Sequence, residues 1–126
     1  MIHRFAFTSL VIFIAVLFAG CSKSPESTVE NFFQALEKAK LTEAKSFLSA
    51  QSIEKTGEVN VIPALANYSR NLEKCGGIKK IEVNLSGEGE IRTAVATIQH
   101  LNNDKCPIKV EKVELLKENG TWKILL

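Results

Sequence analysis

The chain has 126 residues, with 16 lysines and arginines against 14 aspartates and glutamates, which gives a formal net charge of +2. This length suits one domain with one hydrophobic core. Basic and acidic residues are interspersed along the chain. The composition therefore excludes the clustered basic face of a nucleic-acid-binding protein, and we expect no nucleic acid among the partners.

Residues 1–21 have the organisation of a secretory signal. Arg4 supplies a positive charge, and the apolar run that follows is shorter than the ~20 residues of a membrane-spanning helix. The run ends in Leu-Phe-Ala-Gly-Cys at 17–21, which resembles the lipobox of bacterial lipoproteins. The resemblance implies cleavage between Gly20 and Cys21 and attachment of acyl chains, such as palmitate, to the Cys21 sulfur.

The resulting domain organisation is a signal peptide over 1–20, a lipidated cysteine with a short tether over 21–24, and a single α+β domain over 25–126. Two acyl chains are enough for stable membrane anchoring. Ser22 stands where an aspartate would favour retention in the inner membrane. By this resemblance we expect the bacterial envelope as the location, on the periplasmic face of the outer membrane.

Three helices are predicted after the tether. Ser24 as N-cap and Pro25 at the first position begin the first, which should reach about residue 39. A short second helix is predicted with Thr42 as its cap. The polar stretch 50–60 is predicted to be a loop because it contains Gly57. The third helix should run from 61 to 74 with Pro63 in its first turn.

The apolar period then changes from helical to alternating, which predicts four strands. Strands over about 81–85, 91–101, 106–117 and 121–126 are separated by turns near 88, 103 and 119. The apolar pattern of the third strand slips near Glu111 and Lys112, which predicts a β-bulge there. The expected fold is therefore α+β, with three N-terminal helices packed on the concave face of a four-stranded antiparallel meander.

Two stretches and the order of elements resemble the nuclear transport factor 2-like (NTF2-like) superfamily, a cystatin-like α+β fold. These are the first helix, 27–36, and the final hairpin, 118–124. The chain also resembles small bacterial lipoproteins of unknown function with this fold. The resemblance implies a cone-shaped cavity between the helices and a bent sheet. Some members of the superfamily are enzymes and others only bind.

Cys75 and Cys106 remain once Cys21 is assigned to lipid. A pair of cysteines in an oxidising compartment predicts a disulfide. The predicted turns bring both to the end of the second strand. As reduced thiols they could bind zinc together with His100, but a fourth ligand is missing. We therefore expect no metal and no cofactor.

Few residues are suited to catalysis. His100 is the only histidine after the predicted signal peptide, and we expect it to be a solvated residue at a strand end. Asp104 is the only aspartate and is expected to close its own turn through its side chain. Glu54 and Glu58 are expected to be solvated. Four aromatic residues are candidates for lining the cavity, although core packing is their simplest role: Phe33, Phe47, Tyr68 and Trp122.

The sequence favours a lipid-anchored, non-catalytic domain that binds an envelope protein partner or a small apolar ligand. The alternative is a cavity enzyme of the isomerase or dehydratase type that uses Tyr68 or His100 as acid or base. A third reading is a homodimer that pairs through the outer sheet face. The second strand permits it because it is mildly apolar on both sides, with Ala94, Ala96 and Ile98 opposed to Ile91, Val95 and Leu101.

Overall fold

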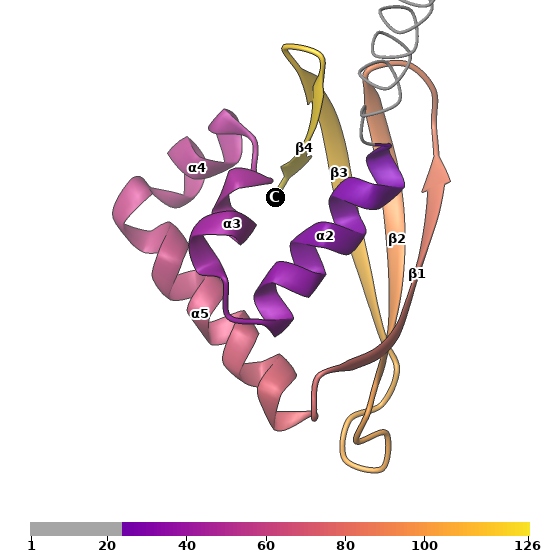
Figure 1. Cartoon of the computed structure of the whole chain (residues 1–126). Helices are drawn as coiled ribbons and strands as arrows, with labels where there is room; N and C mark the ends of the chain where they lie inside the picture. The colour runs from indigo at the N-terminus through magenta and orange to yellow at the C-terminus, as the bar shows by residue number, and fades with distance from the viewer. Residues whose placement is uncertain (1–23) are drawn as a thin grey trace, which may run out of the picture.

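The computed structural model describes residues 24–126, so Gly20 and Cys21, the predicted cleavage and lipidation sites, lie outside the described residues. Helices come first and strands follow (Figure 1). The elements are α2 (Pro25–Glu37), α3 (Leu41–Ser46), α4 (Ala50–Thr56), α5 (Glu58–Lys74), β1 (Ile78–Ser86), β2 (Ile91–His100), β3 (Lys109–Glu118) and β4 (Thr121–Leu125). In this part of the chain, no helix has the length and apolar character needed to cross a membrane.

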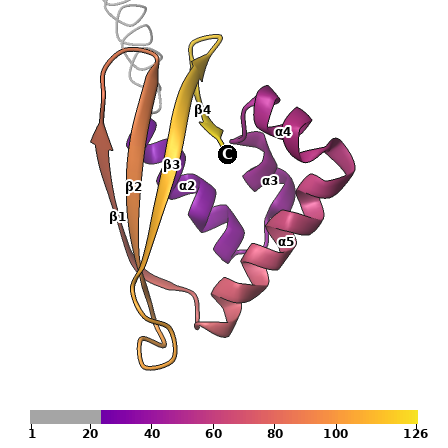
Figure 2. The same ribbon diagram turned by 180° about the vertical axis from the view of Figure 1, so that it is seen from behind.

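The strands form one antiparallel sheet in the order β1-β2-β3-β4. The helices lie on one face of this sheet, and α2 lies between the sheet and α5 (Figures 1 and 2). The α+β class and the four-stranded meander are thus confirmed. The helices number four within residues 24–126, one more than predicted.

Helix α2 begins as the sequence predicts. The Ser24 side chain accepts a hydrogen bond from the Ser27 N–H at 3.2 Å, and Pro25 occupies the first turn. The apolar stripe of α2 is buried against the sheet and α5, and each large side chain in it contributes about 1.5–3 kcal/mol of burial free energy. The stripe consists of Val29, Phe32, Phe33 and Leu36.

The predicted loop over 50–60 is wrong, because this stretch forms α4 and the beginning of α5. Buried Ser49 caps α4 by accepting a hydrogen bond from the Ser52 N–H at 3.1 Å. Thr42 is not a cap, since α3 begins at Leu41. Pro63 lies inside α5 rather than in its first turn, since α5 begins at Glu58.

A short parallel bridge joins the helical layer to the edge of the sheet. The Ile124 N–H donates to the Phe47 carbonyl, and the Ser49 N–H donates to the Ile124 carbonyl, both at 2.8 Å. Leu48 is the residue bridged to Ile124 and is buried. This contact fixes α3 and α4 against β4.

The predicted bulge near Glu111 and Lys112 is also wrong. The pairing of β2 with β3 is continuous from Ile91 to Ile98, and the register shift lies instead in β1, between Ile78 and Lys80. The third strand begins at Lys109, and Val110 is exposed, whereas Val113 and Leu115 are buried. The apolar pattern of the sequence slips because apolar residues at the beginning of β3 occupy the outer face of the sheet.

Candidate functional site

The predicted disulfide between Cys75 and Cys106 is present, with 5.7 Å between the two Cα atoms. Cys75 follows the last residue of α5, and Cys106 lies in the loop that connects β2 to β3. The bond therefore ties the end of the helical layer to the end of the sheet.

Backbone hydrogen bonds hold the same loop in place. The Asn102 N–H donates to the Cys75 carbonyl at 3.0 Å, and the Leu101 N–H donates to the Gly77 carbonyl at 3.3 Å. Asn102 in turn accepts from the Lys105 and Cys106 N–H groups. Among the described residues, no hydrogen bond of the Asp104 side chain closes this turn. The prediction that Asp104 closes it is therefore wrong, and the backbone hydrogen bonds close the turn instead.

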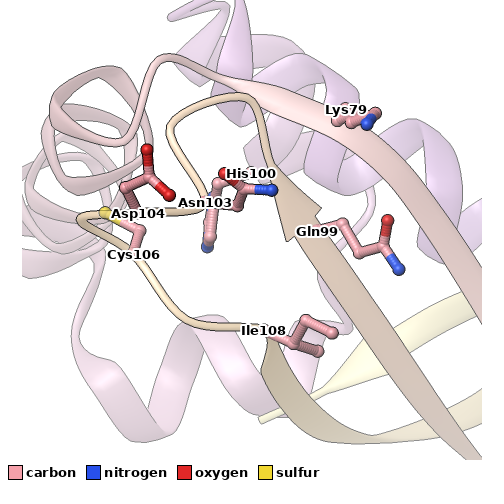
Figure 3. Close-up of a pocket in the computed structure, with 7 residues that line it drawn as sticks. All are labelled: Lys79, Gln99, His100, Asn103, Asp104, Cys106 and Ile108. Atoms are coloured by element: carbon pink, nitrogen blue, oxygen red, sulfur yellow. The ribbon is translucent and has the colours of Figure 1, made fainter.

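A hollow of about 400 Å³ opens where β2 passes into this loop. Figure 3 shows the side chains of His100, Asn103 and Asp104 gathered at the loop, with Gln99 on β2 and Ile108 just before β3. Lys79 and Cys106 complete the lining. A volume of this size is within the range of small-molecule sites. Because the disulfide and the backbone bonds fix one wall, the hollow is largely preformed.

His100 is buried, which corrects the prediction that it is solvated. Its exposed fraction is 4%, and its Nδ1 has no hydrogen-bond partner among residues 24–126. An unpaired buried polar atom costs about 1–3 kcal/mol. The signal that could have revealed this burial is the alternation in β2, where Ala94, Ala96 and Ile98 face the core and His100 is next in phase.

Two opposite charges line the hollow. Lys79 is the extra residue at the register shift of β1, and Asp104 stands in the exposed turn. Within residues 24–126 neither forms an ion pair, whereas neighbouring Lys80 pairs with Glu82 at 2.7 Å. The two charges are therefore available to a ligand.

Tyr68 lies away from this hollow. It projects from α5 toward β3, and its hydroxyl donates to Glu111 Oε1 at 3.1 Å. Lys109 Nζ lies 4.9 Å from the ring centroid and 3.1 Å from Glu111 Oε1. Burial, followed by the charge and hydrogen bond of Glu111, raises the pKa of Tyr68 well above its usual value. The phenol therefore stays protonated at neutral pH.

The other proposed cavity residues lie in or against the core. Phe33 and Trp122 are buried, and Phe47 is half-buried against the same cluster. The Phe33 ring centroid lies 5.9 Å from that of Tyr68. None of the four lines the hollow of Figure 3, so their lining of a cavity stays a prediction.

The zinc alternative lacks its ligands because the disulfide uses both cysteine sulfurs. Among residues 24–126, no group of three or more His, Cys, Asp or Glu side chains is placed to hold a metal ion. Glu54 is exposed, and the exposed Glu58 forms an ion pair with Lys45.

Comparison with known proteins gives a family and a fold. Residues 18–125 match the model of DUF4878, a domain of unknown function. Among solved structures, the chain is similar to a Campylobacter jejuni protein described as a candidate NTF2-like transpeptidase. That likeness has 19% identity and a TM-score of 0.69, and it covers 82% of this chain and 99% of that one. At this identity it shows the fold alone. No curated protein matches the chain.

Proposed function

Because this chain belongs to the DUF4878 family, a domain of unknown function with an NTF2-like fold here, we propose that it is a lipid-anchored binding domain of the bacterial envelope. Its ligand enters the hollow beside His100. The observation that carries the proposal is that His100, whose buried Nδ1 has no hydrogen-bond partner among residues 24–126, is one of the residues that line this hollow. A ligand that pairs with this atom would recover the free energy that its burial costs.

The lining of the hollow supports a polar ligand rather than the small apolar one expected from the sequence. Five of its seven residues have polar or charged side chains, and Ile108 is the large apolar residue among them. Small-molecule sites use a few such groups to fix orientation. A small polar molecule, or a polar segment of an envelope protein, is therefore the better fit.

The separation of Tyr68 and His100 supports binding over catalysis. Tyr68 bonds Glu111, which pairs with Ala96 of β2, and His100 lies four residues farther along that strand. At ~3.3 Å per residue these positions are about 13 Å apart. General acid–base chemistry needs groups that converge on one reacting centre with pKa values near the working pH. Tyr68 meets neither condition.

The membrane anchor in this proposal rests on Cys21. Helix α2 begins at Pro25, four residues after Cys21, so the intervening residues span roughly 10 Å at most. The proposed location is the periplasmic face of the outer membrane, with the domain close to the lipid surface.

The anchor can be tested by labelling cells with palmitate and separating their membranes. The wild-type chain should carry label and sediment with outer membranes, whereas the Cys21→Ser variant should lose both properties. The control is a Cys75→Ser/Cys106→Ser variant, which should keep the label. Equal labelling of wild type and Cys21→Ser, or the wild type in inner membranes, would contradict this part of the proposal.

Binding can be tested by native mass spectrometry of the protein after incubation with the low-molecular-weight fraction of an envelope extract. A bound mass should appear on the wild type and fall in a Lys79→Met/Asp104→Asn variant. Lys80→Met/Glu82→Gln, a neighbouring opposite-charge pair, is the matched control and should bind as the wild type does. An adduct that is equal in all three proteins would place binding elsewhere.

A second candidate is self-association through the outer sheet face. Ile91 of β2 and Val110 of β3 are 62% and 64% exposed. Ile108, just before β3, is 57% exposed. Sedimentation of the wild type and a Val110→Thr variant tests this reading: a dimer weakened by the substitution would support it, and a monomer at high protein concentration would contradict it.

A further inference from the structure

We propose that the hollow beside His100 binds a small zwitterion, namely a free amino acid or a short peptide with both of its termini. This inference rests on the proposed binding function and adds the chemical class of the ligand. It starts from the one ammonium and one carboxylate among the lining side chains, Lys79 and Asp104.

The one positive and one negative side chain in the lining favour a zwitterion as the ligand. Lys79 can attract a carboxylate, and Asp104 can attract an ammonium group. Neither has an ion-pair partner among residues 24–126, so both side chains can pair with a ligand. A simple anion would be opposed by Asp104, and a simple cation by Lys79. A molecule with both charges is attracted by both residues.

The uncharged polar groups fit the same class. The amides of Gln99 and Asn103 each offer donors and an acceptor, so they can serve either end of a zwitterion or a peptide bond. The Nδ1 of His100 supplies one further hydrogen-bonding atom that no described residue uses. Ile108 provides an apolar contact for a short side chain.

The geometry is held before any ligand arrives. Asp104 and Asn103 belong to the loop that the disulfide and the Asn102 backbone bonds fasten to the end of α5. Gln99 and His100 lie in β2, the second strand of the sheet. Preorganisation of this kind lowers the entropy cost of binding. Because Lys79 and Asp104 are exposed, we expect an affinity weaker than micromolar.

The test uses the protein produced from the full chain and purified in detergent micelles. Imidazole nitrogen NMR follows His100, the only histidine after the proposed signal peptide, and a His100→Leu variant confirms the assignment of its signal. The probes are alanine and alanyl-alanine, and the single-charge controls are propionate and propylamine. Alanine or alanyl-alanine should shift the His100 signal in a saturable way, and each control should bind at least tenfold more weakly.

Variants separate the two ends of the ligand. Lys79→Met and Asp104→Asn should each weaken zwitterion binding roughly fivefold, and Lys80→Met should leave it unchanged. The relative affinities of alanine and alanyl-alanine distinguish a free amino acid from a peptide. The inference is overturned if neither probe shifts the signal at 10 mM, or if propionate or propylamine binds as tightly. An envelope adduct seen by mass spectrometry without zwitterion binding would overturn this inference while the binding function stands.

Discussion

Removal of the disulfide between Cys75 and Cys106 has an effect whose magnitude follows from the loop it closes. The two cysteines are 31 residues apart in the sequence. In the chain-entropy description, cross-linking a loop of this length reduces the entropy of the unfolded chain by an amount worth about 3.7 kcal/mol at 25 °C. Typical domains have a free energy of unfolding of about 5–15 kcal/mol, so this bond supplies a large fraction.

The assay compares the wild type with Cys75→Ser/Cys106→Ser by urea unfolding at neutral pH. We expect a decrease of about 3–4 kcal/mol in the unfolding free energy, and a decrease in Tm on the order of 15–30 °C. Hydrogen exchange adds a local measurement. The Asn102 N–H bonds the Cys75 carbonyl, so its protection should fall more than that of the Ile124 N–H, which bonds the Phe47 carbonyl.

A decrease below about 1 kcal/mol would refute this reasoning, because the loop-entropy contribution would then be absent or offset. The hydrogen-exchange protection of the Asn102 and Ile124 N–H groups gives a second test. If Asn102 and Ile124 lose protection equally, the bond acts on global stability alone and does not specifically fasten the wall of the hollow.

Three other changes have predictable outcomes. Tyr68→Phe should lower the free energy of unfolding by roughly 1 kcal/mol and make its dependence on alkaline pH flatter. The pKa of Tyr68 is raised in the folded state, so the phenol stabilises the wild type fully below pH 10, and this stabilisation is lost as the pH rises through the folded-state pKa. Urea unfolding of both proteins at several pH values measures the difference. Ser49→Ala should lower the free energy of unfolding by about 1–2 kcal/mol, which is more than Ser24→Ala should at its exposed cap. Equal decreases for the two variants would contradict the larger contribution of the buried cap. Gly77→Ala should cost about 1 kcal/mol or more in thermal unfolding, because Gly77 has φ +87°; an unchanged Tm would contradict this.

The sequence predicted the elements that have a strong apolar period or a specific cap. Helix α2 combines the cap Ser24, Pro25 and an uninterrupted apolar stripe, and it lies where predicted. The four strands follow from alternation and from turns such as Asn119-Gly120. The disulfide followed from the number of cysteines and the placement of the turns.

The prediction was wrong where long-range contacts override local pattern. Helix α4 has almost no apolar stripe; Ser49 and Ser52 stabilise it through bonds to each other and to β4, which lies some 70 residues away. The pattern of β3 appeared to slip because Val110 faces outward.

The candidate site was predicted only in part. The sequence predicts His100 as a solvated residue at a strand end and Asp104 as a residue that closes its own turn, and it does not predict that the two share a site. Their common hollow depends on the end of β2, the disulfide-bonded loop and the register shift of β1 at Lys79. A register shift is set by pairing with a distant strand, so local sequence does not reveal it.

The central claim is that His100 is kept buried and unpaired for a ligand, and ligand-linked stability of the wild type and a His100→Leu variant tests it most directly. Without ligand, the variant should be as stable as the wild type or more so, because it lacks the unpaired nitrogen. Alanine or alanyl-alanine at ten times its Kd should stabilise the wild type by about 1.4 kcal/mol and leave the variant unchanged. Equal stabilisation of both proteins, or of neither, would contradict the claim.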